Sequence, residues 1–258
     1  MANHIQSTIE APIKDWVFLR GLSREHAHWG DFLSRCEAEL DWNCHAIDLP
    51  GFGSEYQRQS PRNISAIRRD VQTRLPHPLQ NSTKPFGIIA LSLGGMVALD
   101  WLANSPEQIA KIIFINTSTG DCPLFQRLQI KSLGPALGAL LAPSLIKRER
   151  AALAMVSNCH SNDPELLKDW CQISTARPIT KTNVLRQLFA AARYRAPATI
   201  SGAPQLLISS RADRMVSYHC SECLAAKYRW PLVLHNSAGH DLPIDDPTWL
   251  IEVFKRNA

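Results

Sequence analysis

Short apolar runs alternate with longer amphipathic stretches along the chain, and this alternation predicts a sheet of mostly parallel strands flanked by helices, the α/β class. The run from Phe86 to Leu91 is apolar throughout, as is typical of a strand covered on both faces. The expected strands are residues 16–19, 44–49, 86–91, 111–116, 205–210 and 231–235. The expected helices are residues 25–40, 64–75, 94–103 and 217–228, with a last helix that begins at Pro247.

The alternation stops after residue 116, and residues 121–200 show no strand pattern. Asp163 and Thr180 stand where helices of this segment would begin. We therefore expect an α/β core made of residues 1–120 and 201–258, interrupted by a helical cap at residues 121–200. Two sequential domains are the alternative, but they leave too little chain after the insertion for a second core.

Composition excludes several classes of protein. The net charge of +5 over 258 residues is too weak to indicate nucleic-acid binding, and no apolar stretch is long enough to span a bilayer. Residues 1–14 lack the apolar core of a secretory signal. Seven cysteines at irregular spacings favour a reducing, cytoplasmic setting, and Cys220 and Cys223 suit one face of a helix. We expect a cytoplasmic monomer that needs no metal or other cofactor.

The segment Ala90-Leu91-Ser92-Leu93-Gly94-Gly95 follows a buried strand and opens a helix. This strand–turn–helix context is that of a nucleophile elbow, in which a serine sits on a sharp turn and its neighbours two positions away must be small. Ala90 and Gly94 meet that requirement, although Ala90 stands where glycine is usual. A serine–glycine turn without chemistry is the plainer interpretation of the same residues.

A serine nucleophile needs a base, and the base needs an acid to orient it. Asp213 follows one expected strand and His240 follows the next, so both should meet Ser92 at the carboxyl edge of the sheet. Each residue alone is more often a turn former or a solvated side chain; the order Ser, Asp, His is what favours catalysis. Asp121 is the reserve acid, and Asp241, Asp245 and Asp246 are expected to be turn and cap residues.

The loop after the first strand should supply a backbone donor to an oxyanion hole. Gly21 permits an unusual turn there, which makes the Leu22 N–H the expected donor, with the Leu93 N–H as its partner. The turn Asp48-Leu49-Pro50-Gly51-Phe52-Gly53 is interpreted as structural.

These motifs, in this order, resemble the α/β-hydrolase superfamily over nearly the whole chain. Within it the arrangement is similar to the pimeloyl-acyl-carrier-protein methyl esterases of biotin synthesis, which carry a four-helix cap at the same point. Much of the likeness is shared with other small esterases and with a menaquinone-pathway lyase. Position 20 is Arg where many members have His, but a backbone donor role at Leu22 does not depend on that side chain.

Charge is unevenly distributed. Residues 121–200 hold eleven Lys and Arg against five acids, a net charge of +6, whereas the rest of the chain holds 17 and 18, a net charge of −1. A basic cap would attract an acidic acyl carrier protein, although helical caps are also Lys- and Arg-rich for solubility. The candidate docking residues cluster in two short stretches: Arg148, Arg150, Arg186, Arg193 and Arg195. Apolar residues of the cap are expected to line an acyl pocket: Leu128, Leu133, Leu137, Leu185 and Phe189.

The sequence therefore predicts a serine carboxylesterase that acts on an acyl ester, with a carrier-bound methyl ester such as pimeloyl-acyl-carrier-protein methyl ester as the favoured substrate. Two alternatives remain open. One is a generic small-molecule esterase or thioesterase, and the other is a non-hydrolytic lyase or binding protein on the same fold.

Overall fold

A single parallel sheet organises the protein in the computed structural model, which describes residues 12–202 and 205–257. The six strands lie in the order β2-β1-β3-β4-β5-β6, and every neighbouring pair is parallel. Their bounds are β1 Asp15–Leu19, β2 Asn43–Ala46, β3 Phe86–Leu91, β4 Ile109–Ile115, β5 Leu206–Ser210 and β6 Leu232–His235. The predicted α/β fold class is confirmed, and all carboxyl strand ends share one edge.

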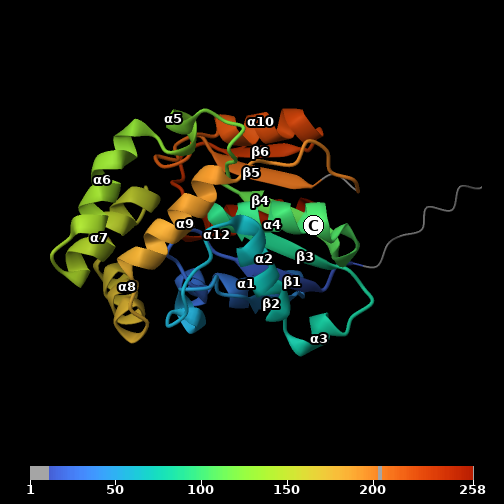
Figure 1. Cartoon of the computed structure of the whole chain (residues 1–258), viewed down its shortest axis with the longest axis horizontal. Helices are drawn as coiled ribbons and strands as arrows, with labels where there is room; N and C mark the ends of the chain where they lie inside the picture. Colours follow the sequence, from blue (N-terminus) through green and yellow to red (C-terminus); the bar gives the residue numbers. More distant parts are fainter. Residues whose placement is uncertain (1–11, 203–204, 258) are drawn as a thin grey trace, which may run out of the picture.

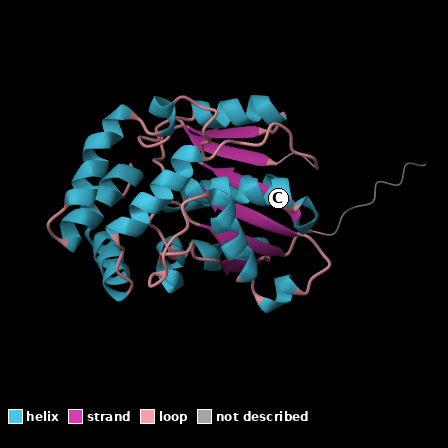
Figure 2. Cartoon of the chain, in the orientation of Figure 1, coloured by secondary structure: helices cyan, strands magenta, loops and turns pink. Residues whose placement is uncertain are grey.

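Helices cover both faces of this sheet (Figures 1 and 2). On one face Val17 and Leu19 of β1 pack with α2 (Ile64–Thr73), α4 (Leu93–Asn104) and α10 (His219–Tyr228). On the other face Trp16 and Phe18 pack with α1 (Phe32–Leu40) and α12 (Pro247–Asn257). Alternate residues of one strand thus feed two separate cores, because successive side chains of a strand point to opposite faces. Two single-turn helices, α3 (His77–Gln80) and α11 (Leu242–Asp245), complete this part of the chain.

Five helices fill the interval between β4 and β5, and we call them the inserted helices. They are α5 (Leu124–Arg127), α6 (Ile130–Leu141), α7 (Leu145–Val156), α8 (Pro164–Ala176) and α9 (Lys181–Arg193). As expected, the Asp163 side chain caps α8 by accepting from the Glu165 and Leu166 N–H groups, and Thr180 caps α9. Within the described ranges, no helix has the length and apolar character that crossing a membrane requires.

Two predicted elements differ from their expected bounds by more than two residues or are interrupted. The predicted helix 25–40 is divided into a 3₁₀ turn, His26–Trp29, and α1, because Gly30 adopts a positive φ of 57° that a continuous α-helix does not allow. The predicted strand 44–49 is β2, which ends at Ala46, although the Ile47 N–H still donates to the Phe18 carbonyl at 3.1 Å. The Pro50-Gly51 turn follows directly.

The β3–α4 turn is packed tightly against the end of β1. A Cβ placed on Gly94 would lie 2.6 Å from the Leu19 carbonyl oxygen and 2.8 Å from that of Arg20. These distances are well inside van der Waals contact, so only glycine lets α4 begin this close to β1. The small residue that the elbow pattern requires after Ser92 is therefore a packing necessity.

We expect Gly94→Ala to destabilise the protein by about 1–3 kcal/mol, because its methyl group would force backbone away from backbone. Urea unfolding would measure the change in the free energy of unfolding. The matched control is Gly138→Ala in α6, where a Cβ meets no atom within 4 Å, and which should be neutral or stabilise by up to about 1 kcal/mol. Equal effects of the two substitutions would contradict the packing argument.

Candidate active site

Ser92 occupies a strained backbone position between β3 and α4. Its φ is 55° and its ψ is −115°, a region that residues other than glycine rarely adopt and that clusters at functional sites. The turn is held by hydrogen bonds: the Ser92 N–H donates to the Ile115 carbonyl at 2.9 Å, and the Thr117 hydroxyl donates to the Ser92 carbonyl at 2.7 Å. The side chain is thereby presented at the carboxyl edge of the sheet, beside the N-terminus of α4.

Asp213 and His240 meet at the same edge, from the loops after β5 and β6. His240 Nδ1 lies 2.7 Å from Asp213 Oδ2, and both side chains are buried. The other carboxylate oxygen, Oδ1, accepts from the Met215 N–H at 2.7 Å and the Val216 N–H at 3.1 Å. Three hydrogen-bonding groups thus hold the carboxylate in one orientation, with one oxygen aimed at the imidazole.

The environment raises the pKa of His240 above its ordinary value. Burial alone lowers it, but the charge of Asp213 and the hydrogen bond to it raise it, and the charge of Asp241 adds to that effect. The net direction means that the site stabilises a proton on His240, which is what a base needs after it has taken one.

Ser92 and His240 line one cavity of about 510 Å³. Leu22 lies on its wall, and apolar side chains from α6, α7 and α9 close much of the rest. Of the hydrogen bonds that the described residues make, none joins the Ser92 hydroxyl to His240, and the two residues are related by the cavity that both line. The structure therefore places the serine and the histidine around a shared volume.

The loop after β1 lies against Ser92. A Cβ on Gly21 would lie 3.1 Å from the Ser92 Cβ, so the backbone of the neighbouring Leu22 passes close to the serine. The N–H groups of Leu22 and Leu93 donate to no other described residue. Both predicted oxyanion donors are thus near the serine and free of internal acceptors.

A buried ion pair that the sequence did not reveal joins this loop to the histidine loop. Arg20 Nη1 donates to Asp241 Oδ1 at 3.1 Å, and Nη2 contacts Oδ2. The guanidinium lies 4.6 Å from the Trp29 ring centroid, and both charged side chains are 3% exposed. Asp241 is therefore more than the turn residue we expected, because it neutralises the buried Arg20 guanidinium.

Asp245 also exceeds its predicted role as a turn residue. Its carboxylate accepts from the Gly239 N–H at 2.5 Å and from the Asn158 N–H at 2.9 Å. It thereby ties the histidine loop to the residues that follow α7. Asp246, by contrast, caps α12 as expected, by accepting from the Trp249 N–H at 3.0 Å.

Asp121, the reserve acid, does not contact His240. Its carboxylate accepts from the Ala196 N–H at 2.8 Å, the Thr119 hydroxyl at 2.9 Å and Lys227 Nζ at 3.2 Å. It joins the two ends of the insertion to α10 instead.

The expected apolar pocket residues divide into two groups. Leu128, Leu133 and Leu137 line the cavity, whereas Leu185 and Phe189 on α9 are 53% and 48% exposed and lie outside its lining. On α9 the lining residues are Lys181, Val184 and Leu188, which form a neighbouring stripe at spacings of three and four. The pattern located the helix but chose the wrong face.

The five candidate docking arginines have different surroundings. Arg148 lies against Glu149 and lines the cavity; Arg186 and Arg195 donate to the core carbonyls of Ser60 and Gly120. Arg193 lies over the Phe189 ring, and Arg150 is exposed.

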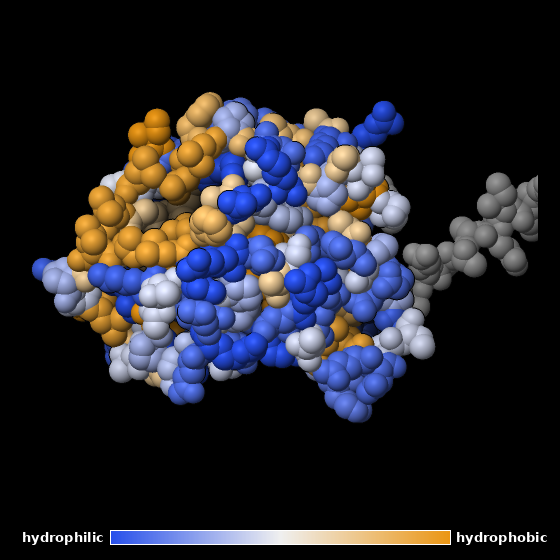
Figure 3. All heavy atoms as spheres, viewed as in Figure 1, coloured by the Kyte–Doolittle hydropathy of each residue, from blue (hydrophilic) through white to orange (hydrophobic). Residues whose placement is uncertain are grey.

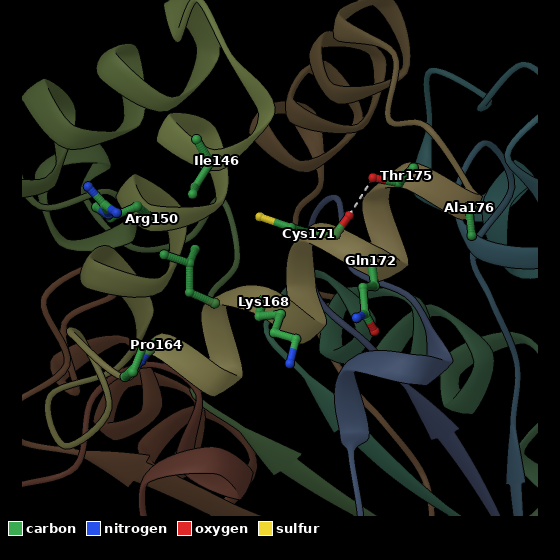
Figure 4. Close-up of a pocket in the computed structure, with 9 residues that line it drawn as sticks. Ile146, Arg150, Pro164, Lys168, Cys171, Gln172, Thr175 and Ala176 are labelled. Atoms are coloured by element: carbon green, nitrogen blue, oxygen red, sulfur yellow. Dashed lines mark hydrogen bonds between the residues drawn. The ribbon is translucent and has the colours of Figure 1, made fainter.

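A second hollow, of about 630 Å³, opens between α7 and α8, with Arg150 and Lys168 on its two sides (Figure 4).

Exposed apolar side chains gather on the inserted helices, as the hydrophobic area over α6 and α7 shows (Figure 3). The large apolar residues with high exposure are Leu124, Phe125, Ile130, Leu133, Leu137, Leu141, Ile146, Leu185, Leu188 and Phe189. Within the described part of the chain, no group of three or more His, Cys, Asp or Glu could hold a metal ion.

The chain belongs to the alpha/beta hydrolase family, whose family model matches residues 16–253. It is 25% identical over 251 residues to a pimeloyl-[acyl-carrier protein] methyl ester esterase of Aeromonas hydrophila, covering 93% of this chain and 94% of that relative. A second esterase of the same name, from Vibrio parahaemolyticus, is 28% identical over 117 residues, 45% of this chain and 40% of the relative. The solved 2-hydroxy-6-oxo-6-phenylhexa-2,4-dienoate hydrolase of Rhodococcus sp. strain RHA1 superimposes with a TM-score of 0.76 at 20% identity, covering 95% and 90% of the two chains.

The Arg20–Asp241 pair yields a stability prediction. Arg20→Met leaves Asp241 buried without its counter-charge and should lower the free energy of unfolding by about 3–5 kcal/mol. Arg20→Met combined with Asp241→Leu replaces both charges by apolar groups and should recover most of that loss. Urea unfolding of wild type, both single variants and the double variant measures the coupling; additive losses would show that the pair does not act as a unit.

Proposed function

We propose that this protein is a serine carboxylesterase with Ser92 as nucleophile, His240 as base and Asp213 as the acid that orients it. One observation carries the proposal. His240 is hydrogen-bonded to Asp213 at 2.7 Å and lines the same cavity as Ser92, whose backbone φ is 55°. Left-handed backbone at a serine and a buried carboxylate–imidazole pair are each uncommon, and their convergence is what acyl transfer requires.

In the acylation step the Ser92 hydroxyl attacks the ester carbonyl while His240 Nε2 takes its proton. Asp213 holds Nδ1 as the N–H, so that Nε2 is the basic nitrogen, and stabilises the imidazolium that forms. His240 then returns the proton to the departing alcohol. The charge of Asp213 and its hydrogen bond, which help to raise the pKa of His240, also favour the imidazolium formed when the imidazole takes the Ser92 proton.

The tetrahedral intermediate carries its negative charge on the former carbonyl oxygen. The N–H groups of Leu22 and Leu93 supply the two hydrogen bonds for this oxyanion, helped by the positive end of the α4 dipole. Water activated by His240 attacks the acyl-enzyme, and a second collapse releases the acid and regenerates Ser92.

The cavity favours an acyl chain as substrate. Residues 121–200 act as a cap over the core formed by residues 1–120 and 201–258, and Leu128, Leu133 and Leu137 supply an apolar wall facing Ser92. Burial of methylene groups against such a wall contributes about 0.8 kcal/mol each.

We propose further that the acyl ester is carried by an acidic acyl carrier protein in the cytoplasm, as in biotin biosynthesis. Both curated relatives are named for such a substrate, and residues 121–200 carry the net charge of +6. Among the described candidates, Arg150 and Arg193 are exposed and make neither an ion pair nor a side-chain hydrogen bond, whereas exposed Arg195 is held by the Gly120 carbonyl. Lys168 lines the hollow between α7 and α8 together with Arg150. Long-range attraction of this kind speeds encounter more than it adds affinity.

Ser92→Ala tests the nucleophile. The variant should keep the unfolding profile of wild type and lose about 10⁴-fold or more of its kcat on p-nitrophenyl esters, because the acyl-enzyme can no longer form. A fluorophosphonate probe should label wild type and leave Ser92→Ala unlabelled. Ser105→Ala, in the surface turn after α4, is the matched control and should retain both properties. Near wild-type turnover by Ser92→Ala would end the serine-hydrolase proposal.

Charge reversal tests the carrier. Arg150→Glu combined with Arg193→Glu should lower kcat/KM on a carrier-bound acyl methyl ester several-fold and leave a short free methyl ester little changed, because only the carrier contacts the rim. Added salt should lower the wild-type rate on the carrier substrate alone, by screening.

The control for this experiment is Arg69→Glu combined with Lys84→Glu, two exposed cations of the core outside the inserted helices. It changes the net charge by the same amount and should spare both substrates. Equal losses on both substrates in the Arg150/Arg193 variant would indicate damage to the cap, and no loss on the carrier substrate would remove the carrier from the proposal.

A further inference from the structure

Charged groups are unevenly balanced in the wall of the cavity. Its lining includes four cations, Arg20, Arg24, Arg148 and Lys181, and two anions, Glu149 and Asp241. Arg20 and Asp241 neutralise each other. The remaining wall therefore has more positive than negative charge, in a cavity that is otherwise mostly apolar.

Arg24 is the most buried of the unbalanced cations. It is 9% exposed, lies in the loop after β1 three residues beyond Gly21, and stacks 4.1 Å from the centroid of the Trp170 ring. Its Nη1 donates to Glu149 Oε2 at 2.8 Å. Burying a guanidinium costs several kcal/mol unless it is compensated, so its position beside the cavity calls for a full counter-charge.

Glu149 cannot supply that charge to Arg24 alone, because it is shared. Its Oε1 accepts from Arg148 Nε and from the Ser174 hydroxyl, both at 3.0 Å. Burial raises the pKa of Glu149. The charge and hydrogen bond of Arg24, the hydrogen bond from Ser174 and the charge of Arg148 together lower it by more, so the pKa lies below its ordinary value and the carboxylate is ionised. One negative charge therefore serves two guanidinium groups.

Among the described residues, no second carboxylate forms an ion pair with Arg24 or Arg148. His28 Nε2 lies 3.2 Å from Arg24 Nη1, but burial, followed by the charge of Arg24, lowers the pKa of His28 well below its ordinary value, and the ring is neutral. Arg24 Nη2 and both Nη atoms of Arg148 donate to no described residue. Planar donors are thus left over in a wall that Ser92 also lines.

We propose that Arg24 and Arg148 form a binding subsite for a carboxylate at the far end of the acyl chain, so that the preferred free substrates are half-esters of dicarboxylic acids. The subsite rests on the proposed ester hydrolysis and not on the carrier partner. Two guanidinium groups match the two oxygens of a carboxylate, and the apolar surroundings strengthen their attraction. The apolar residues that line the same cavity bind the methylene chain.

A purely structural role for Arg24 makes a different prediction. The Arg24–Glu149 pair joins the loop after β1 to α7, and Glu25 contacts Arg177 next to it. If these contacts only held the inserted helices in place, every ester would respond alike to their loss. A carboxylate subsite instead changes the preference between charged and neutral chains.

Binding to a Ser92→Ala background tests the subsite without turnover. Calorimetry should show that the monomethyl esters of dicarboxylic acids bind more tightly than methyl esters of monocarboxylic acids of equal chain length, at one or more lengths in a graded series. Arg148→Gln should reduce this preference about ten- to hundredfold, the usual range for hydrogen bonds to a charged group. Arg148→Lys keeps the charge but loses the planar fork and should retain part of it.

Lys147→Gln, an exposed neighbour on α7 outside the cavity lining, removes the same charge and should keep the wild-type preference. The subsite is rejected if half-esters bind no better than neutral esters at any length, or if Arg148→Gln weakens both equally. Half-ester binding in Ser92→Ala with no ester turnover by wild type would reject the esterase and keep the subsite. Ester turnover by wild type without a preference for half-esters would keep the esterase and reject the subsite.

Discussion

The contact between the start of α4 and the end of β1 is the constraint on which the site depends. Because the Gly94 backbone lies against the Leu19 and Arg20 carbonyls, the chain must turn sharply between β3 and α4. That turn gives Ser92 its positive φ and brings the loop after β1 beside it. The position of Ser92, its closeness to the loop that holds Leu22 and its place at the N-terminus of α4 therefore follow from a single close approach.

Buried charge pairs then connect loops that are remote in sequence. Asp213 and His240 join the loops after β5 and β6. Arg20 and Asp241 join the loop after β1 to the histidine loop. Arg24 and Glu149 join the loop after β1 to α7. Each pair is costly to desolvate and strongly destabilising to break. Their effect is on orientation, because they hold these loops in one arrangement around the cavity.

The sequence predicted those features of the fold and the site that depend on neighbouring residues. The strands, the caps at Asp163 and Thr180, and the order of Ser92, Asp213 and His240 are visible because each rests on neighbouring residues or on the common strand edge. The Arg20–Asp241 pair spans 221 positions, and no local signal links its members. The face of α9 was misjudged because Leu185 and Phe189 are apolar yet exposed, so periodicity alone could not tell cavity from solvent.

The inserted helices leave and re-enter the core at one place. The Gly120 N–H donates to the Tyr194 carbonyl at 2.8 Å, and Arg195 Nη1 donates to the Gly120 carbonyl at 2.9 Å. A segment whose two ends meet imposes no distance between the strands that it separates, so its length and helix content are free to vary while the sheet stays the same. The architecture thus lets evolution exchange the helices that wall the cavity without rebuilding the edge of the sheet that carries Ser92, Asp213 and His240.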